Sequence, residues 1–272
     1  MQRSLWRPSL IAMLASAVAL PAAAQDAAAP DSQIAEEGDA IREIIVSAQK
    51  RDQNLQDVPI AITAFGAEAL QERGLADVSA ISALTPNVNL DGGTPFSGSS
   101  AVLSATIRGI GSDDFAFNID PGVGIYLDGV FLARTVGANQ DLLDVERIEV
   151  LKGPQGTLFG RNTIGGAILV KTREPEIGEF SGRGRLRVGE DDLVEGSAAL
   201  NLPIGKTAAA RVSGGFRKRD GYVLRSFDSL DLGNDNVYTF NAALKWEVSP
   251  SLDVLLRGDY TNRNENGAPF TG

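Results

Sequence analysis

The stretch VERIEVLKGPQGTLFGRNTIGGAILVKT, residues Val145–Thr172, decides the fold of this chain. Its two apolar runs, Ile148–Leu151 and Ala167–Val170, are each long enough for a buried strand. Five glycines and one proline lie between the runs, and this composition indicates a sharply turning backbone that packs closely against a neighbour. Two unrelated structures fit the pattern, a phosphate-binding loop and a structural hairpin.

The stretch lacks the lysine that a phosphate-binding loop requires. Such a loop needs a lysine and then a serine or threonine directly after its last glycine, to hold the phosphates and a metal ion. Gly160 and Gly165 have the required glycine spacing, but Gly166 and Ala167 occupy the two positions that follow. The sequence therefore favours the structural hairpin.

The composition excludes most catalytic chemistry. The chain contains no cysteine and no histidine, so thiolate metal sites, histidine-ligated metals and a Ser-His-Asp triad are impossible. We expect no enzyme, no cofactor and no metal site. The formal net charge of −10, from 25 Lys and Arg against 35 Asp and Glu, also argues against nucleic-acid binding, because phosphate contacts need clustered basic residues.

The N-terminus predicts export. Arg3 and Arg7 precede an apolar run, Leu10–Leu20, and small residues follow up to Ala24. This run is shorter than the roughly 20 apolar residues that span a membrane. We therefore expect a cleaved signal peptide over residues 1–24, followed by a disordered acidic extension over residues 25–42.

A short segment and a small domain follow this extension. Residues 43–51, EIIVSAQKR, are compatible with the first strand of the next domain or with an extended peptide that adds to another protein's sheet edge. Over residues 52–174 the pattern predicts a strand at Val58–Phe65, a helix at Ala67–Arg73, a helical run at Asp77–Leu84 and a loop at Leu90–Ser100. These signals predict a small α+β domain.

Residues 175–272 alternate polar and apolar side chains with a period of two, in five segments of about ten residues. A soluble antiparallel sheet has the same alternation. The segment length, the aromatic residues near the ends of the apolar face and a long polar loop at Arg219–Asn236 favour a transmembrane β-barrel. About eight strands are needed to close a barrel, so we expect an incomplete barrel and hence a fragment of a longer protein.

The order of these parts resembles the TonB-dependent outer-membrane receptors. The matching motifs cover most of the mature chain: Glu43–Arg51, Asp57–Phe65, Ile107-Arg108-Gly109, Val123–Val130 and above all Asp144–Thr172. The resemblance implies a plug domain over residues 52–174, inside a barrel of about 22 strands whose first strands are residues 175–272. It also implies the outer membrane of a Gram-negative bacterium, with the plug and residues 43–51, the TonB box, on the periplasmic side.

In such receptors the protein TonB pairs with the box and pulls, so that the plug yields and a bound ligand passes. The partners implied are TonB, outer-membrane lipid and a small metal chelate, most often a ferric siderophore. The residues implied for TonB binding are Glu43, Ile44, Ile45, Val46, Ser47 and Ala48. The charged plug residues expected to contact the barrel wall are Arg108, Arg147, Glu149 and Lys152.

The ligand itself is left open by the sequence. Phe96, Phe115 and Phe117 lie in two predicted apical loops of the plug and are candidate ligand contacts, although loop aromatics also pack locally. Cobalamin or an oligosaccharide is an alternative ligand. A truncated protein and a structural outer-membrane protein that transports nothing are the alternative functions.

Overall fold

The computed structural model describes residues 44–93, 98–116 and 118–267. Glu43, Phe96 and Phe117, together with the predicted signal peptide and acidic extension, lie outside the described residues.

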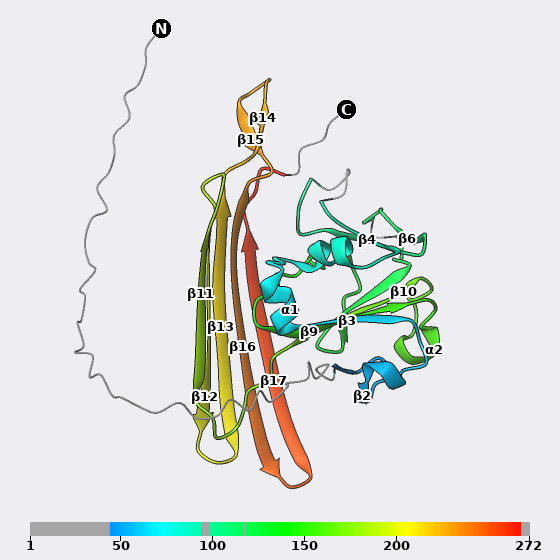
Figure 1. Cartoon of the computed structure of the whole chain (residues 1–272), viewed down its shortest axis with the longest axis vertical. Helices are drawn as coiled ribbons and strands as arrows, with labels where there is room; N and C mark the ends of the chain where they lie inside the picture. The colour runs from blue at the N-terminus through cyan, green and yellow to red at the C-terminus, as the bar shows by residue number, and fades with distance from the viewer. Residues whose placement is uncertain (1–43, 94–97, 117, 268–272) are drawn as a thin grey trace, which may run out of the picture. The chain divides into compact units, whose positions relative to one another are not determined.

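The Val145–Thr172 stretch forms the predicted hairpin at the centre of a five-stranded sheet (Figure 1). The strand order is β3 (Ile62–Gly66), β9 (Val145–Lys152), β10 (Gly166–Thr172), β7 (Val123–Leu127) and β8 (Val130–Phe131). The hairpin strands β9 and β10 are antiparallel, and a single helical turn, α2 (Gly156–Phe159), lies in their connection. Ile148, Val150 and Ile168 are fully buried, as expected for strands covered on both faces.

The paired glycines of the hairpin serve close packing. A Cβ atom on Gly166, whose φ is +152°, would lie 2.2 Å from the carbonyl oxygen of Leu151. A Cβ atom on Gly165 would lie 2.7 Å from the carbonyl oxygen of Ile110 in the neighbouring sheet. Only glycine lets the two sheets of the domain approach this closely.

The neighbouring sheet has three strands, β4 (Val88–Gly92), β5 (Leu103–Ile107) and β6 (Ile110–Ser112). The prediction of a loop at Leu90–Ser100 was therefore wrong for its first residues. Val88 and Leu90 are buried and pair with Ile107 and Ala105, so burial overrides the glycine-rich sequence that follows them.

Helices are few and short. The predicted helix forms as α1 (Ala67–Glu72), and the main-chain N–H groups of Arg73 and Gly74 close its end. The second helical run is a 3₁₀ helix, η2 (Val78–Leu84), whose first turn is capped by the Asp77 side chain. No helix in the described part of the chain is long and apolar enough to cross a membrane.

Residues 44–57 form a separate small motif. The two-residue strands β1 (Ile45–Val46) and β2 (Gln53–Asn54) are antiparallel, and a 3₁₀ turn, η1 (Leu55–Asp57), follows them.

Five long strands follow the plug and form one antiparallel sheet, as the period-two pattern predicts (Figure 1). They are β11 (Ser181–Val188), β12 (Val194–Ile204), β13 (Ala208–Arg219), β16 (Asp235–Ser249) and β17 (Leu252–Arg263). The predicted long loop between β13 and β16 contains a small hairpin of β14 (Val223–Arg225) and β15 (Leu230–Leu232).

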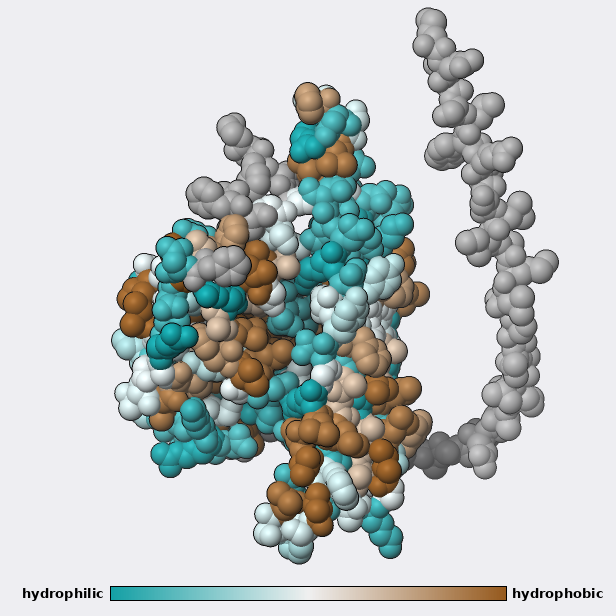
Figure 2. Space-filling view, turned by 180° about the vertical axis from the view of Figure 1, so that it is seen from behind, coloured by the Kyte–Doolittle hydropathy of each residue, from teal (hydrophilic) through white to brown (hydrophobic). Residues whose placement is uncertain are grey.

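The register gives this sheet one apolar and one charged face. Leu186, Leu256 and Tyr260 on the apolar face are 60–72% exposed, and Figure 2 shows apolar side chains gathered over the lower part of these strands. Among the charged residues of the five strands only Lys218 shares the apolar face. A sheet with an exposed apolar face and a charged face toward the plug is the arrangement of a transmembrane barrel wall.

Candidate functional site

The box segment, residues 43–51, lies against the plug where it is described. Its strand β1 pairs with β2, and the Leu55 N–H donates to the carbonyl oxygen of Ile44 at 2.9 Å. Val46 and Ala48 are fully buried, whereas Ile44 and Ile45 remain partly exposed. The segment therefore has an inner side bound to the plug and an outer side open to a partner.

Glu149 of β9 holds this segment. The Glu149 side chain is 1% exposed, and its Oε1 accepts hydrogen bonds from the N–H of Ser47 at 2.8 Å and from the Ser47 hydroxyl at 3.1 Å. The same oxygen accepts from Arg147 Nε at 2.8 Å. Oε2 has no hydrogen-bond partner among the described residues. One buried carboxylate thus joins the box segment directly to the central sheet.

Arg147 supplies the opposing charge. Burial lowers the pKa of Arg147, but the hydrogen bond to Glu149 and the negative charges of Glu146, Glu149 and Asp52 outweigh burial and raise that pKa above its ordinary value. The distance from Arg147 to Asp52 is 3.5 Å. Arg147 is therefore always charged, and its ion pairs join β9 to Asp52, the residue directly after the box segment.

Asp144, directly before β9, fastens the plug to the barrel strands. Its carboxylate accepts from Arg211 Nε at 2.6 Å and from Arg211 Nη2 at 2.8 Å, and it also pairs with Arg183. The side chains of Asp144 and Arg211 are 6% and 8% exposed. A two-point arginine–carboxylate contact of this kind fixes orientation as well as distance.

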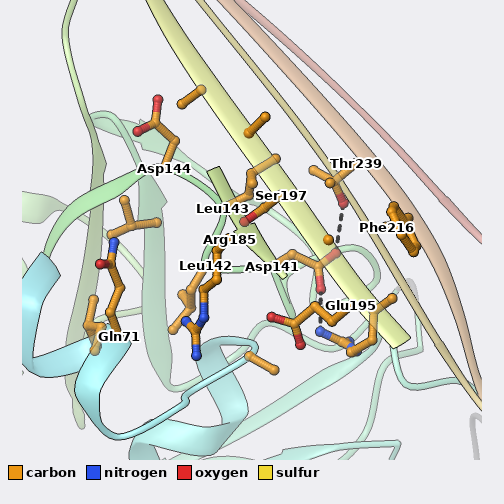
Figure 3. A pocket seen from close by; sticks show the side chains of 18 of the residues that line it. Gln71, Asp141, Leu142, Leu143, Asp144, Arg185, Glu195, Ser197, Phe216 and Thr239 are labelled. Carbon is orange, nitrogen blue, oxygen red and sulfur yellow. Dashed lines mark hydrogen bonds and ion pairs between the residues drawn. The ribbon is translucent and has the colours of Figure 1, made fainter. Parts of the chain in front are cut away.

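Asp141 makes the second contact with the barrel strands. It lies 3.3 Å from Arg217 and 3.0 Å from Arg263, and it accepts a hydrogen bond from the Thr239 hydroxyl at 2.9 Å. Figure 3 shows this hydrogen bond between Thr239 and Asp141, and both residues line a cavity of about 190 Å³. Asp144 lines the same cavity, which is large enough for several water molecules.

Two further plug carboxylates continue this pattern. Asp128 pairs with Arg257 of β17, and Glu174 lies 3.3 Å from Arg257 and 3.2 Å from Lys245. Burial raises the pKa of Glu174, but the hydrogen bond from Lys245 and the nearby positive charges outweigh it, so that pKa is lowered. We call these four carboxylates, Asp128, Asp141, Asp144 and Glu174, with their barrel partners, the plug–barrel interface.

The predicted wall-contact residues have their described contacts inside the plug and the box segment. Arg147 and Glu149 pair with each other, Glu149 binds Ser47 of the box segment, and Arg147 pairs with Asp52 directly after that segment. Lys152 donates to the carbonyl oxygen of Pro86 at 3.1 Å, and burial together with the charge of Arg108 lowers its pKa. Arg108 is exposed in the β5–β6 turn, with a φ of 53°. Contact of these four residues with the barrel wall stays a prediction.

Among the predicted ligand contacts only Phe115 is described, and it is half-buried in an apical loop. The described residues contain no cluster of carboxylates that could hold a metal ion.

The sequence analysis missed the four carboxylates of the plug–barrel interface. Asp128, Asp144 and Glu174 lie within two residues of a strand end, and Asp141 lies in the segment between β8 and β9. A solvated loop charge is the ordinary expectation at all four positions. Their signal was the row of arginines on the polar face of the barrel strands, at positions such as Arg183, Arg211 and Arg257. Buried basic residues on the inner face of a barrel wall are expected to pair with acidic residues on the domain that fills the barrel.

The fold and the site define a class of protein, a β-barrel wall with an α+β domain bound to its charged face. The family described as TonB-dependent Receptor Plug Domain matches residues 54–167. Residues 54–167 therefore form a domain of this family, and the proteins that the chain resembles are outer-membrane receptors and transporters.

Individual relatives agree with this assignment. The pesticin receptor of Yersinia pestis is 30% identical over 134 residues, which are 49% of this chain and 19% of that protein. The vitamin B12 transporter BtuB of Vibrio vulnificus is 25% identical over 84% of this chain and 37% of its own length. The chain thus spans well under half of these relatives.

Solved structures share the fold. The ferric yersiniabactin uptake receptor FyuA of Yersinia pestis has a TM-score of 0.59 and 27% identity, over 69% of this chain and 29% of that one. The ferripyoverdine receptor of Pseudomonas aeruginosa has a TM-score of 0.64 over 80% of this chain and 27% of its own, at 18% identity.

Proposed function

We propose that the complete receptor imports a scarce ligand, most often a ferric siderophore or a similar iron complex, with energy delivered by TonB to the box segment. Two observations support an iron complex: the similarity to FyuA, a ferric yersiniabactin uptake receptor, and the similarity to an iron-regulated outer membrane virulence protein of Vibrio cholerae. The similarity to BtuB supports cobalamin as the alternative ligand.

The observation that carries the proposal is the direct bond between the box segment and β9. A partner strand that adds to β1 has only the two residue pairs of β1 and β2 to compete with. Tension on Ser47 is then applied to Glu149, in the middle of the strand that links β3 to β10. A pulling force on the box segment is therefore transmitted to the central sheet directly, through the hydrogen bonds between Ser47 and Glu149.

The sequence of steps follows from connectivity. Loss of the Ser47 contacts frees the box segment, and continued tension reaches β3, which is the edge strand of the central sheet. Tension on β3 and β9 pulls on Asp144, which directly precedes β9. The plug–barrel interface then parts and opens a path beside the plug.

The test is deletion of Glu43–Ala48 in the complete receptor. Deletion should abolish energised uptake, measured with a panel of radiolabelled iron chelates, cobalamin and oligosaccharides, and leave binding of the same ligand to the cell surface intact. Deletion of the upstream residues 31–36 is the matched control and should leave uptake unchanged. Continued energised uptake without residues 43–48 contradicts the proposal, and uptake of none of these ligands favours a structural protein.

A further inference from the structure

The plug–barrel interface has one polarity. In every ion pair between the plug and the barrel strands of the described residues, the acid lies on the plug and the base on the wall. Asp144 pairs with Arg183 and Arg211, Asp141 with Arg217 and Arg263, Asp128 with Arg257, and Glu174 with Arg257 and Lys245. At these contacts the wall is basic and the plug surface is acidic, although the chain as a whole has a net charge of −10.

Three hydrogen bonds follow the same direction, whereas Ser100 of the plug donates to Glu265, just beyond β17. Thr239 donates to Asp141 at 2.9 Å, and Arg257 donates to the Thr172 hydroxyl at 2.8 Å. Arg263 donates to the carbonyl oxygen of Asn139 at 3.0 Å. Wall donors that face plug acceptors define a lumen surface suited to groups rich in oxygen acceptors.

The Asp144 site shows what such a surface recognises. Two guanidinium groups, from strands β11 and β13, converge on one carboxylate, and Arg211 contacts both of its oxygens. Both Asp144 and Arg211 are more than nine-tenths buried. When the plug yields, this pair of arginines loses its carboxylate and needs a new counter-ion, for which water and mobile anions compete with any anionic group that passes.

We propose that the barrel wall recognises an anionic cargo, whose carboxylate or similarly charged oxygen groups replace Asp144 as the counter-ion of Arg183 and Arg211 during passage. This assignment rests on the import function proposed above and narrows its ligand class. An anionic metal chelate satisfies the wall arginines as the plug withdraws, whereas a neutral oligosaccharide leaves them to water and mobile anions. The plug carboxylates thus occupy the places that the cargo's acidic groups take in transit.

The binding chemistry is tested by chemical rescue in the detergent-solubilised complete receptor. Asp144→Gly empties the carboxylate site without backbone strain, because the φ of Asp144 is 55° and glycine adopts that value readily. The substitution should lower the melting temperature of the plug by several degrees, and acetate should restore at least half of that loss. Acetamide, which has the same shape and no charge, should restore none.

Two variants control the rescue. Asp144→Gly combined with Arg211→Gln should show no response to acetate. Asp192→Gly makes the same change at an exposed turn residue with a φ of 52° and should behave as the unsubstituted receptor. Equal rescue by acetamide, or rescue that survives Arg211→Gln, overturns the assignment of a carboxylate site.

The cargo class is tested by the ion selectivity of the loosened receptor. The complete receptor with Asp144→Gly is placed in a planar bilayer under a potassium chloride gradient. The sign of its reversal potential should show that chloride permeates more readily than potassium. Removing Arg183 and Arg211 as well should move that potential toward potassium by a measurable shift, while Arg225→Gln, on the β14–β15 hairpin, should not. Cation selectivity, or a permeability that is unchanged from the unsubstituted receptor, overturns the anionic cargo. Both experiments omit TonB, so a failure of energised uptake is distinguishable from a failure here.

Discussion

In the central sheet of the plug, Ile148, Val150 and Ile168 are fully buried against other aliphatic side chains. At the plug–barrel interface the corresponding contacts are carboxylates on arginines, beside a cavity of about 190 Å³ that polar and apolar side chains line together. The stabilisation from buried apolar surface is not screened by ions, and water is a poor substitute for an apolar neighbour. Charged contacts exchange their partners for water or for other ions, so the interface parts without exposing an apolar core. The contrast predicts a plug that moves against the wall while its core stays intact.

The largest effect is expected inside the sheet. Ile148→Ala should lower the free energy of unfolding of the plug by about 2–5 kcal/mol, because it leaves a cavity in a fully buried position. Protease protection of the plug across a urea series measures this loss. Leu158→Ala, at a position that is 39% exposed, should change it by less than about 0.5 kcal/mol. Similar losses at both positions contradict an apolar core here.

The interface should give the next largest effect, and that effect should depend on salt. Asp144→Asn should weaken the attachment of the plug by about 1.5–3 kcal/mol, since it removes charged hydrogen bonds from Arg211 and Arg183. Raising the ionic strength should narrow the difference between this variant and the unsubstituted receptor. If the difference in urea midpoint between the two proteins does not change with salt, the substitution acts by altering packing and not by removing charge. Asp192→Asn, in an exposed turn, is the control.

The glycine contact between the two plug sheets should be comparably sensitive. Gly165→Ala places a Cβ 2.7 Å from the carbonyl oxygen of Ile110 and should destabilise the plug by about 1–3 kcal/mol. Gly156→Ala meets nothing within 4 Å and is the matched control, expected to be neutral or slightly stabilising. Equal urea midpoints for the two alanine variants argue against close packing at Gly165.

The bond between the box segment and β9 should be weaker. Ser47→Ala removes the hydroxyl contact with Glu149 and should favour release of the box segment by about 1 kcal/mol, roughly a fivefold change. The rate at which a maleimide labels Ala48→Cys reports this release, because Ala48 is fully buried while the segment is bound and the chain has no cysteine of its own. Thr157→Ala, at an exposed position on α2, should not alter the rate. An unchanged labelling rate in the Ser47→Ala variant would show that the hydroxyl contact with Glu149 does not hold the box segment.

The smallest effect concerns pH at Glu174, the last residue of the plug, in the linker that leads from β10 to β11. The pKa of Glu174 is lowered from its ordinary value of 4.5, so its ion pairs stabilise the folded state above that value and are lost as the pH falls below it. Protease protection of the linker should therefore decline in acid, and Glu174→Gln should show a shallower decline. If Glu174→Gln has the same pH profile as the unsubstituted receptor, Glu174 is not the cause of the pH dependence of protease protection.

The sequence predicts patterns that depend on neighbours along the chain. The Val145–Thr172 hairpin and the alternation of the five barrel strands are of this kind, because strand period and turn glycines act locally. The strand at Val88–Gly92 was not predicted, because its pairing with β5 outweighs its glycines.

The partners of the charged residues could not be predicted either. Arg147 and Glu149 stand out in an apolar run, yet the run alone does not say whether they pair with a wall or with Ser47, 102 residues away from Glu149. Asp141 and Asp144 look like loop charges until barrel strands that follow much later bring arginines to them.

Two engineered disulfides test the central claim most directly. Leu143→Cys with Gly215→Cys joins the plug to β13, where a Cβ on Gly215 would lie 3.2 Å from the Leu143 side chain. Leu151→Cys with Ala167→Cys joins two register partners inside the β9–β10 hairpin. In the complete receptor, the first disulfide should abolish energised ligand uptake until a reductant is added, and the second should leave uptake intact. Uptake that survives the first disulfide and is abolished by the second contradicts a plug that moves at its charged interface.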